Sequence, residues 1–305
     1  MEFKYKNEEK IRLDKFLTEQ LNDQTRSQIK KLILSGLVLV NEESCSVHHW
    51  LKKDDIIKIN TNNETPAKKI IPKKLQPKII EQTDDYLVIE KPTRLLVHPT
   101  EKLETDTLAD WLRDNFPSIA KIGDEPMRPG IVHRLDKDVS GLMVVALNNP
   151  SFYALKKQFQ DRTIKKEYLA LVHGAMRESE GEINAPIERD RETGLMKVQI
   201  VKKAGKVAIT TYKVERKFIN YTLIKVKIKT GRTHQIRAHL YSIGHSMVGD
   251  TLYRTKDIRK KKKIIDDLRI FLHAHYLSFQ DQDGIWQEYT SPLPNNLEKF
   301  LTTLK

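Results

Sequence analysis

One stretch in the middle of the chain constrains its fold more than any other. Residues 128–147 open with the turn signal Pro129-Gly130 and close with an apolar run of strand length, Leu142 to Leu147. Loops held by strands are where rigid scaffolds present reactive groups, although a solvated loop whose cations neutralise two aspartates would have the same composition. The polar residues between turn and strand are His133, Arg134, Asp136, Lys137, Asp138 and Ser140.

Length and composition place the chain among soluble proteins with two domains. At about 150 residues per domain, 305 residues predict two units. The single cysteine, Cys45, excludes an internal disulfide and argues against a cysteine-built metal site. No apolar run approaches the roughly 20 residues that a membrane helix needs. We therefore expect a cytoplasmic protein without a membrane partner.

The basic charge of the chain is concentrated in its second half. The formal net charge is +13, and residues 161–305 contribute +11 of it, with 28 basic and 17 acidic groups. Such an excess fits a polyanion partner, since neutralising phosphates supplies the sequence-independent part of nucleic-acid affinity. A merely soluble basic surface would give the same count, so composition favours RNA without requiring it.

The first 60 residues predict a small unit of two helices followed by short strands. Apolar residues recur at helical spacing over residues 11–21 and again over 29–33, and strands are expected at 37–40 and 56–59. Thr25 or Ser27 can cap the second helix, whose opposite face is basic. That face carries Arg26, Lys30 and Lys31.

This pattern resembles the small RNA-binding module of ribosomal small-subunit protein four. The resemblance rests on short motifs that include Arg12-Leu-Asp-Lys-Phe-Leu17, Gly36-Leu-Val-Leu-Val-Asn41 and Lys53-Asp-Asp-Ile-Ile57. An ordinary amphipathic helix with solvated lysines is the alternative, because the unit is nearly neutral overall. The resemblance implies RNA contacts from Arg26, Ser27, Lys30 and Lys31.

After a polar segment broken by prolines, helices and strands alternate irregularly. The pattern predicts a hairpin over 79–92, helices over 107–116 and 151–160, and strands over 167–173 and 221–229. A further helix should begin at a Thr233 cap, bury Ile236, Leu240 and Ile243, and end at Gly244. We therefore expect an α+β fold with a mixed, mostly antiparallel sheet and flanking helices, preceded by the small helical and β domain.

The sequence lacks the common motifs for binding cofactors and metals. His273 and His275 share one side of a strand, yet no acidic or histidine pair has the helical spacing of a zinc or two-metal site, so structural histidines explain them better. Phosphate-cradling and dinucleotide-binding glycine loops and the Gly-x-Ser-x-Gly elbow are absent. The remaining candidates are the carboxylate of Asp136 near Arg134 and the predicted helix after Thr233, which carries Arg237.

The loop His133-Arg-Leu-Asp-Lys-Asp-Val-Ser-Gly141 resembles the signature of the RluA-type pseudouridine synthases, which isomerise uridine in ribosomal and transfer RNA. Further stretches agree in order and spacing, so the resemblance spans nearly the whole chain. They are Glu90-Lys-Pro92 with Val97-His-Pro99, Lys166-Glu-Tyr168, and Gly231-Arg-Thr-His-Gln-Ile-Arg-Ala-His239 with Gly249-Asp250.

The resemblance implies a role for each matched residue. Asp136 is the nucleophile, Tyr168 the active-site tyrosine, and Arg237 the arginine that pairs with the aspartate, an opposite charge that would keep the carboxylate ionised. Arg134 would support the RNA when the target base leaves its stack. Arg232 and His234 are either structural partners of the site or RNA contacts. Whether the carboxylate attacks the sugar, attacks the base or removes a sugar proton stays open.

These inferences divide the chain into an RNA-binding domain at 1–62, a lysine- and proline-containing linker at 63–78, and a synthase domain at 79–305. We expect an RNA pseudouridine synthase, an isomerase that needs no cofactor. Its partner would be RNA, with ribosomal RNA of the large subunit favoured and transfer RNA possible, and the chain would act as a monomer. The alternatives are an RNA-binding or ribosome-assembly protein whose synthase domain is inactive, and a metal-dependent nuclease.

Overall fold

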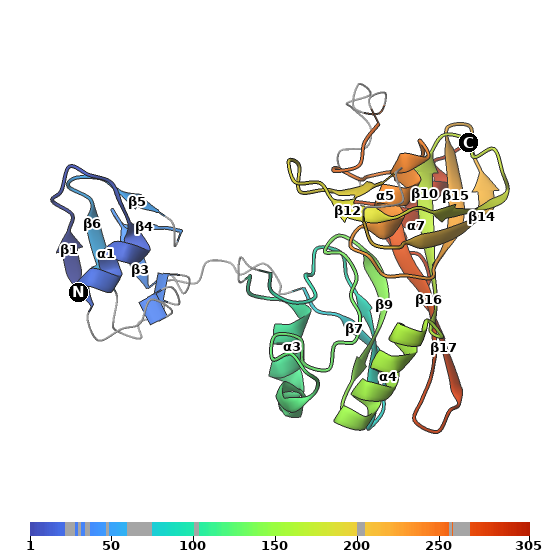
Figure 1. The fold of residues 1–305 in the computed structure, drawn as a ribbon, viewed down its shortest axis with the longest axis horizontal. Helices are drawn as coiled ribbons and strands as arrows, with labels where there is room; N and C mark the ends of the chain where they lie inside the picture. The colour runs from blue at the N-terminus through green and yellow to red at the C-terminus, as the bar shows by residue number, and fades with distance from the viewer. Residues whose placement is uncertain are drawn as a thin grey trace. The chain divides into compact units, whose positions relative to one another are not determined.

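The chain forms two compact units, Met1–Pro72 and Lys73–Lys305, each with its own hydrophobic core (Figure 1). The structure, a computed structural model, describes residues 1–21, 28–29, 32–33, 37–46, 49–59, 75–100, 104–199, 205–255, 258 and 269–305. Most of the predicted linker, and four of the predicted RNA-contacting residues, lie outside this part of the chain. Within it, no helix has both the length and the apolar character needed to cross a membrane.

In the described part of the smaller unit, a helix over residues 13–20 and a two-stranded ribbon pack against a four-stranded antiparallel sheet of order β1-β6-β3-β4. Leu13 and Leu17, one helical turn apart, are fully buried with Ile57 of the sheet. The first predicted helix and the strands predicted at 37–40 and 56–59 are thereby confirmed, whereas the second predicted helix lies largely outside the described residues. The elements are β1 (Glu2–Lys4), β2 (Ile11–Arg12), α1 (Leu13–Gln20), β3 (Val38–Val40), β4 (Glu43–Ser44), β5 (Trp50–Leu51) and β6 (Ile56–Ile59).

The larger unit is built on a nine-stranded sheet of order β11-β14-β15-β10-β16-β9-β8-β7, with β17 paired to β16. Its paired strands run antiparallel except for β9 and β16, so the predicted mixed, mostly antiparallel α+β fold is confirmed. The strands are β7 (Lys78–Gln82), β8 (Tyr86–Lys91), β9 (Ser140–Ala146), β10 (Lys165–His173), β11 (Glu180–Asn184), β14 (Ile209–Lys217), β15 (Tyr221–Ile228), β16 (Leu272–Gln280) and β17 (Trp286–Thr290).

Helices and a small hairpin surround this sheet. Thr107 and Asp110 form a capping box at α3, and Asn148 caps α4, which lies beside β9 and β16 in Figure 1. The predicted helices at 107–116 and 151–160 are confirmed. The remaining elements are α3 (Leu108–Asn115), η1 (Pro117–Lys121), α4 (Asn149–Asp161), β12 (Ile187–Arg189), β13 (Met196–Val198), α5 (Gln235–Ser242) and α7 (Asn295–Thr302).

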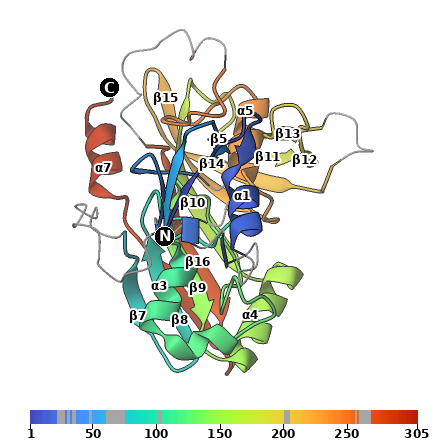
Figure 2. The same cartoon turned by 90° about the vertical axis from the view of Figure 1, so that its left-hand side faces the viewer.

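The two faces of the sheet bury different clusters. On β10, Ala170 and Val172 face the main core, which includes residues of α3 and α4, whereas Leu171 packs with Leu297 of α7. Figure 2 accordingly shows α4 and α7 at opposite margins of this unit. One predicted core residue is wrong: Ile243 is 41% exposed, because α5 ends before it and leaves it at the C-cap.

The parallel contact between β9 and β16 requires a glycine. Gly141 pairs with Ala274 and has a φ of +125°, a backbone conformation that favours glycine. A Cβ at this position would lie 2.3 Å from the carbonyl oxygen of Ala274. The two strands therefore approach each other more closely than any side chain at position 141 would allow.

We expect Gly141→Ala to lower the free energy of unfolding of the larger unit by about 3 kcal/mol or more, since a backbone clash adds to φ strain. Gly231→Ala is the matched control: a Cβ there meets no atom within 4 Å, and φ is not in the left-handed region. Urea denaturation of both variants checks this expectation. Equal midpoints for the two variants would contradict it.

Candidate active site

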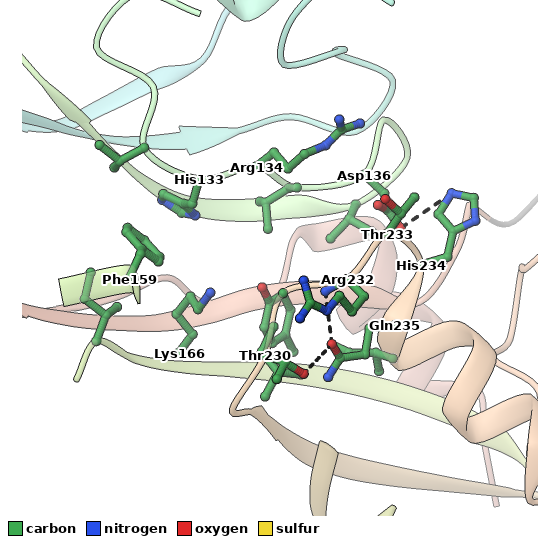
Figure 3. Close-up of a pocket in the computed structure, with 18 of the residues that line it drawn as sticks. His133, Arg134, Asp136, Phe159, Lys166, Thr230, Arg232, Thr233, His234 and Gln235 are labelled. Carbon is green, nitrogen blue, oxygen red and sulfur yellow. Dashed lines mark hydrogen bonds and ion pairs between the residues drawn. The ribbon is translucent and has the colours of Figure 1, made fainter. Parts of the chain in front are cut away.

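A cavity of about 570 Å³ opens in the larger unit where the loop after Gly130 meets β10, the end of α4 and the start of α5 (Figure 3). Its volume lies in the range of small-ligand sites. Among the described residues that line it, Asp136 is the one carboxylate. The basic side chains around it are Arg128, Arg134, Lys156, Arg162, Lys166, Lys229, Arg232 and Arg237.

The loop that carries Asp136 is held by its own turn and by a buried lysine. Val139 N donates a hydrogen bond to the Asp136 carbonyl (3.1 Å), which closes a turn directly after the aspartate. Lys91, fully buried at the end of β8, donates to the carbonyl of Lys137 (3.0 Å) and to that of Leu95 (2.8 Å). Burial lowers the pKa of Lys91 to about 7. Lys91 thus links the loop that carries Asp136 to β8 through a hydrogen bond.

Two nitrogen groups face the Asp136 carboxylate, whose side chain is 19% exposed. Arg237 Nη1 lies 3.6 Å and His234 Nε2 3.9 Å from the same oxygen, Oδ2. Both distances exceed those of hydrogen bonds, and active-site bonds often tighten only in the substrate complex. The predicted proximity of Asp136 and Arg237 is thus present in the structure.

The stronger bonds of Arg237 go to a different aspartate. Asp250 Oδ2 accepts from Arg237 Nε at 2.7 Å, and Asp250 Oδ1 accepts from Nη2 at 2.8 Å. Burial alone would raise the pKa of Asp250, but the bonds from Arg237 lower it below its ordinary value. For Arg237, burial works to lower the pKa and the bonds to Asp250 outweigh it, so the pKa is raised. This buried bidentate pair fixes the guanidinium plane beside Asp136.

Tyr168 and Lys166 enter the cavity from the same side of β10, because they lie two residues apart. Tyr168 is 6% exposed, and burial followed by the charge of Asp136 raises its pKa. Burial lowers the pKa of Lys166 to about 8. Its ammonium lies 4.8 Å from the centre of the Phe159 ring, and His133 stacks on that ring at 4.6 Å between centroids. Figure 3 shows His133, Phe159 and Lys166 together on one side of the cavity, away from Asp136.

The predicted RNA-contacting residues of the larger unit lie around the cavity. Arg134 Nη1 donates to His98 Nε2 at 3.2 Å, and burial lowers the pKa of His98 to about 4. Arg232 donates from Nε to the Val207 carbonyl at 3.1 Å. Arg134, Arg232 and His234 all belong to the lining, so the structure brings them together with Asp136, Tyr168 and Arg237. Arg26, Ser27, Lys30 and Lys31 lie outside the described residues.

The predicted cap of α5 is wrong. The N-cap is His234, not Thr233, and its φ of 51° places it in the left-handed region. Gln235, a residue without a role in the sequence analysis, explains the difference. Its Oε1 accepts from Arg232 N at 3.0 Å and from the Thr230 hydroxyl at 2.7 Å, so it closes a turn before the helix. The turn directs His234 toward Asp136, as Figure 3 shows.

The two histidines of β16 take part in internal contacts. His273 is fully buried between Ser140 (2.8 Å from Nδ1) and Ser291 (3.1 Å from Nε2), and His275 Nε2 lies 3.7 Å from Glu167. Burial lowers the pKa of His273 to about 4. In the described part of the chain no group of three or more histidine, cysteine or acidic side chains is placed to hold a metal ion.

Besides Gln235, three residues that support the site had no individual role in the sequence analysis. Lys91 and Asp250 stand in matched motifs, Glu90-Lys-Pro92 and Gly249-Asp250, so the motifs offered a signal for them. Tyr253 stands three residues beyond Asp250 and is 4% exposed, within reach of both His234 and Arg237. A lone tyrosine outside any quoted motif gave no such signal.

Comparisons with known proteins identify the family of this chain. Residues 85–242 match the family described as RNA pseudouridylate synthase, and residues 11–57 match the S4 domain. An "Uncharacterized RNA pseudouridine synthase" of Aquifex aeolicus (strain VF5) is 37% identical over 314 residues, covering 100% of this chain and 97% of that protein.

Two further relatives extend the likeness. "Ribosomal large subunit pseudouridine synthase D" of Neisseria meningitidis serogroup B (strain ATCC BAA-335 / MC58) is 33% identical over 300 residues, covering 96% of this chain and 79% of that protein. The solved structure of "Human RNA Pseudouridylate Synthase Domain Containing 1" has a TM-score of 0.58 and 28% identity, and covers 72% of this chain and 84% of that one. The matches confirm the resemblance that the motifs indicated, and the chain therefore belongs to the RNA pseudouridine synthase family, as an enzyme that carries an N-terminal S4 domain.

Proposed function

We propose that this enzyme isomerises uridine to pseudouridine in large-subunit ribosomal RNA, with Asp136 as the carboxylate that reacts. The observation that carries the proposal is a single lining carboxylate in a cavity otherwise edged by arginine and lysine, with Arg237 at 3.6 Å. The ribosomal target is supported by relatives named ribosomal large subunit pseudouridine synthase D. Transfer RNA is the second candidate substrate.

The reaction leaves the atomic composition of the nucleotide unchanged. The bond from uracil N1 to the ribose breaks, the uracil turns, and a bond forms from the same ribose carbon to uracil carbon 5; the hydrogen of carbon 5 leaves as a proton, and N1 takes up a proton. An ionised carboxylate can act as a nucleophile or a base in such a sequence, so Asp136 could attack the sugar, attack the base or take a sugar proton. Arg237 would keep this carboxylate ionised and correctly turned.

Tyr168 is the proposed platform for the target uracil. Its ring is flat, buried and reached from the cavity, and aromatic side chains stack on bases of any sequence. Its raised pKa keeps the phenol protonated, so it can donate a hydrogen bond but cannot serve as an anionic base near pH 7. Tyr168 is therefore not the proposed base for a proton that the reaction removes.

The basic rim suits the RNA around the target. Arg134 lies two residues before Asp136 and would fill or support the gap left when the nucleotide turns out of its stack. Arg232 would contact phosphates. The S4 domain, through Arg26, Ser27, Lys30 and Lys31, would add affinity for folded RNA. We expect a monomeric enzyme that needs no cofactor and acts in the cytoplasm.

Asp136→Asn should abolish pseudouridine formation, lowering the rate at least about 10³-fold, because an amide is neither an effective nucleophile nor a base. Carbodiimide mapping of RNA from cells that carry only this variant would show which pseudouridine disappears. Asp138→Asn, an exposed neighbour in the same loop, is the matched control and should keep the site modified.

The same experiment separates the alternatives. If every pseudouridine persists without the protein and with Asp136→Asn, the chain binds RNA without modifying it. Loss of full-length RNA that a chelator prevents would instead identify a nuclease. A site lost from transfer RNA alone would move the proposed target away from the ribosome.

Deleting residues 1–62 should weaken binding to the target RNA by about tenfold or more while the larger unit stays folded, since that unit has its own core. Affinity measured at several salt concentrations checks this, because a lost set of phosphate contacts makes the salt dependence shallower. The control is an unchanged urea transition for the larger unit. Equal affinities at every salt concentration would exclude an RNA-binding role for the S4 domain.

Asp250→Asn should lower the free energy of unfolding by about 3–5 kcal/mol at pH 7, because it leaves the Arg237 guanidinium buried without its charge partner. The lowered pKa of Asp250 means that the pair stabilises the fold above about pH 4 and is lost as the pH falls through that lowered value. The difference between variant and wild type should therefore shrink in acid.

Urea denaturation at pH 7 and at about pH 3 measures this difference. Asp161→Asn, an exposed aspartate at the end of α4, is the control and should change the unfolding free energy little at either pH. A difference between Asp250→Asn and wild type that stays constant with pH would show that the charge of Asp250 does not stabilise the fold.

A further inference from the structure

Tyr253 contacts both groups that face the Asp136 carboxylate. Its hydroxyl lies 3.1 Å from His234 Nδ1, and the Arg237 guanidinium lies 5.1 Å from the centre of its ring. The backbone N–H of Met196, in β13, donates to the same hydroxyl at 2.9 Å. Among the described residues, Asp136 also lies within 4 Å of a nitrogen of His234 and of Arg237, so Tyr253 and Asp136 contact the same two side chains.

Tyr253 is itself firmly anchored. It is 4% exposed and packs with Ile187 of β12 and Ala238 of α5. Its backbone N–H donates to Asp250 Oδ1 at 3.0 Å, the oxygen that also accepts from Arg237. The side chain is therefore fixed at its base by the Asp250–Arg237 pair and at its tip by the β12–β13 hairpin.

The hydrogen bonds around the hydroxyl favour one position for the proton of the His234 ring. The hydroxyl accepts from Met196 N, and its single proton is free to be donated to His234 Nδ1. Burial lowers the pKa of His234, the charge of Asp136 opposes this in part, and the ring is neutral near pH 7. With Nδ1 as the acceptor, the ring proton is on Nε2, the nitrogen that lies 3.9 Å from Asp136. The opposite tautomer would place a lone pair against the carboxylate.

We propose that Tyr253 is a positioning residue of the active site: its hydroxyl holds His234 with an Nε2–H directed at Asp136, and its ring supports Arg237 from the other side. One side chain thus orients both nitrogen donors of the reacting carboxylate and links them to the β12–β13 hairpin. The inference rests on the proposed role of Asp136. His234 is then a donor to the carboxylate and not an RNA contact.

The left-handed backbone of His234 fits this role. A non-glycine residue at φ 51° is strained, and such strain is retained where the surroundings fix it. At this position the Gln235 turn fixes the backbone and Tyr253 fixes the ring. The two constraints place Nε2, and not Nδ1, toward the cavity.

Nitrogen NMR of histidine-labelled enzyme tests the tautomer without substrate. His234, identified by the signal missing in His234→Gln, should show a protonated Nε2 and an unprotonated Nδ1 in the wild type. In Tyr253→Phe the ring and its packing stay, but this preference should be lost. Tyr241→Phe is the control: Tyr241 is 40% exposed, its ring lies 6.0 Å from that of Tyr253, and its loss should leave the signal unchanged. An unchanged His234 signal in Tyr253→Phe would overturn the proposal.

Kinetics supply the second readout. Tyr253→Phe should lower kcat about 10- to 100-fold with KM within about twofold, since a misdirected donor affects the reacting complex more than RNA binding. In His234→Gln the side-chain amide can keep a donor near the position that Nε2 occupies in the wild type, but it has no tautomers. Tyr253→Phe should therefore lower kcat less than about twofold in the His234→Gln background. An equal loss in both backgrounds would overturn the proposal. An active Asp136→Asn enzyme would overturn the proposed role of Asp136, and the NMR signals would still report separately on the Tyr253–His234 bond.

Discussion

The active site depends on the parallel contact between β9 and β16. β9 follows the loop that carries Asp136, and β16 lies between β9 and β10, the strand that carries Tyr168. Gly141 allows the contact because any side chain there would overlap the Ala274 backbone. The other strands of the sheet pair antiparallel. The parallel pairing of β9 with β16 therefore places the loop that carries Asp136 near β10, the strand that carries Tyr168.

The charges of the site are arranged so that Asp136 stays available. Arg237 commits Nε and Nη2 to Asp250 at 2.7 and 2.8 Å, which leaves Nη1 for Asp136 at 3.6 Å. A bidentate clamp on Asp136 would occupy both oxygens of the carboxylate that we propose to react, and would stabilise it before reaction. Asp250 therefore fixes the orientation of Arg237, so that Arg237 provides a positive charge beside Asp136 while the Asp136 oxygens keep lone pairs free.

Much of this site was predictable from the sequence because its residues are local to motifs. Roles for Asp136, Tyr168 and Arg237 were predicted from motif matches, and period-two or helical spacing located α1, α3, α4 and strands such as β3, β6, β10 and β15. The strands β11, β12, β13 and β14 were not predicted. The Asp250 bidentate pair and the contacts of Tyr253 were not predictable, because they join residues through tertiary packing that no spacing rule encodes. The Thr233 cap failed for a related reason: Gln235 builds a side-chain turn that places His234 in a left-handed conformation.

The size of the cavity and the charge of its rim explain how a nucleotide inside a structured RNA can reach Asp136. A cavity of about 570 Å³ suits a nucleoside but not a base-paired helix, so the target must leave its stack at a cost of a few kcal/mol. In the proposed function, stacking of the uracil on Tyr168 inside the cavity would recover part of this cost. The remainder has to come from phosphate contacts outside the cavity, along the basic rim and, as proposed, on the S4 domain. The proposed function thus divides catalysis and RNA affinity between different residues, and under it substitutions in the Asp136 network should reduce kcat while leaving RNA binding nearly intact.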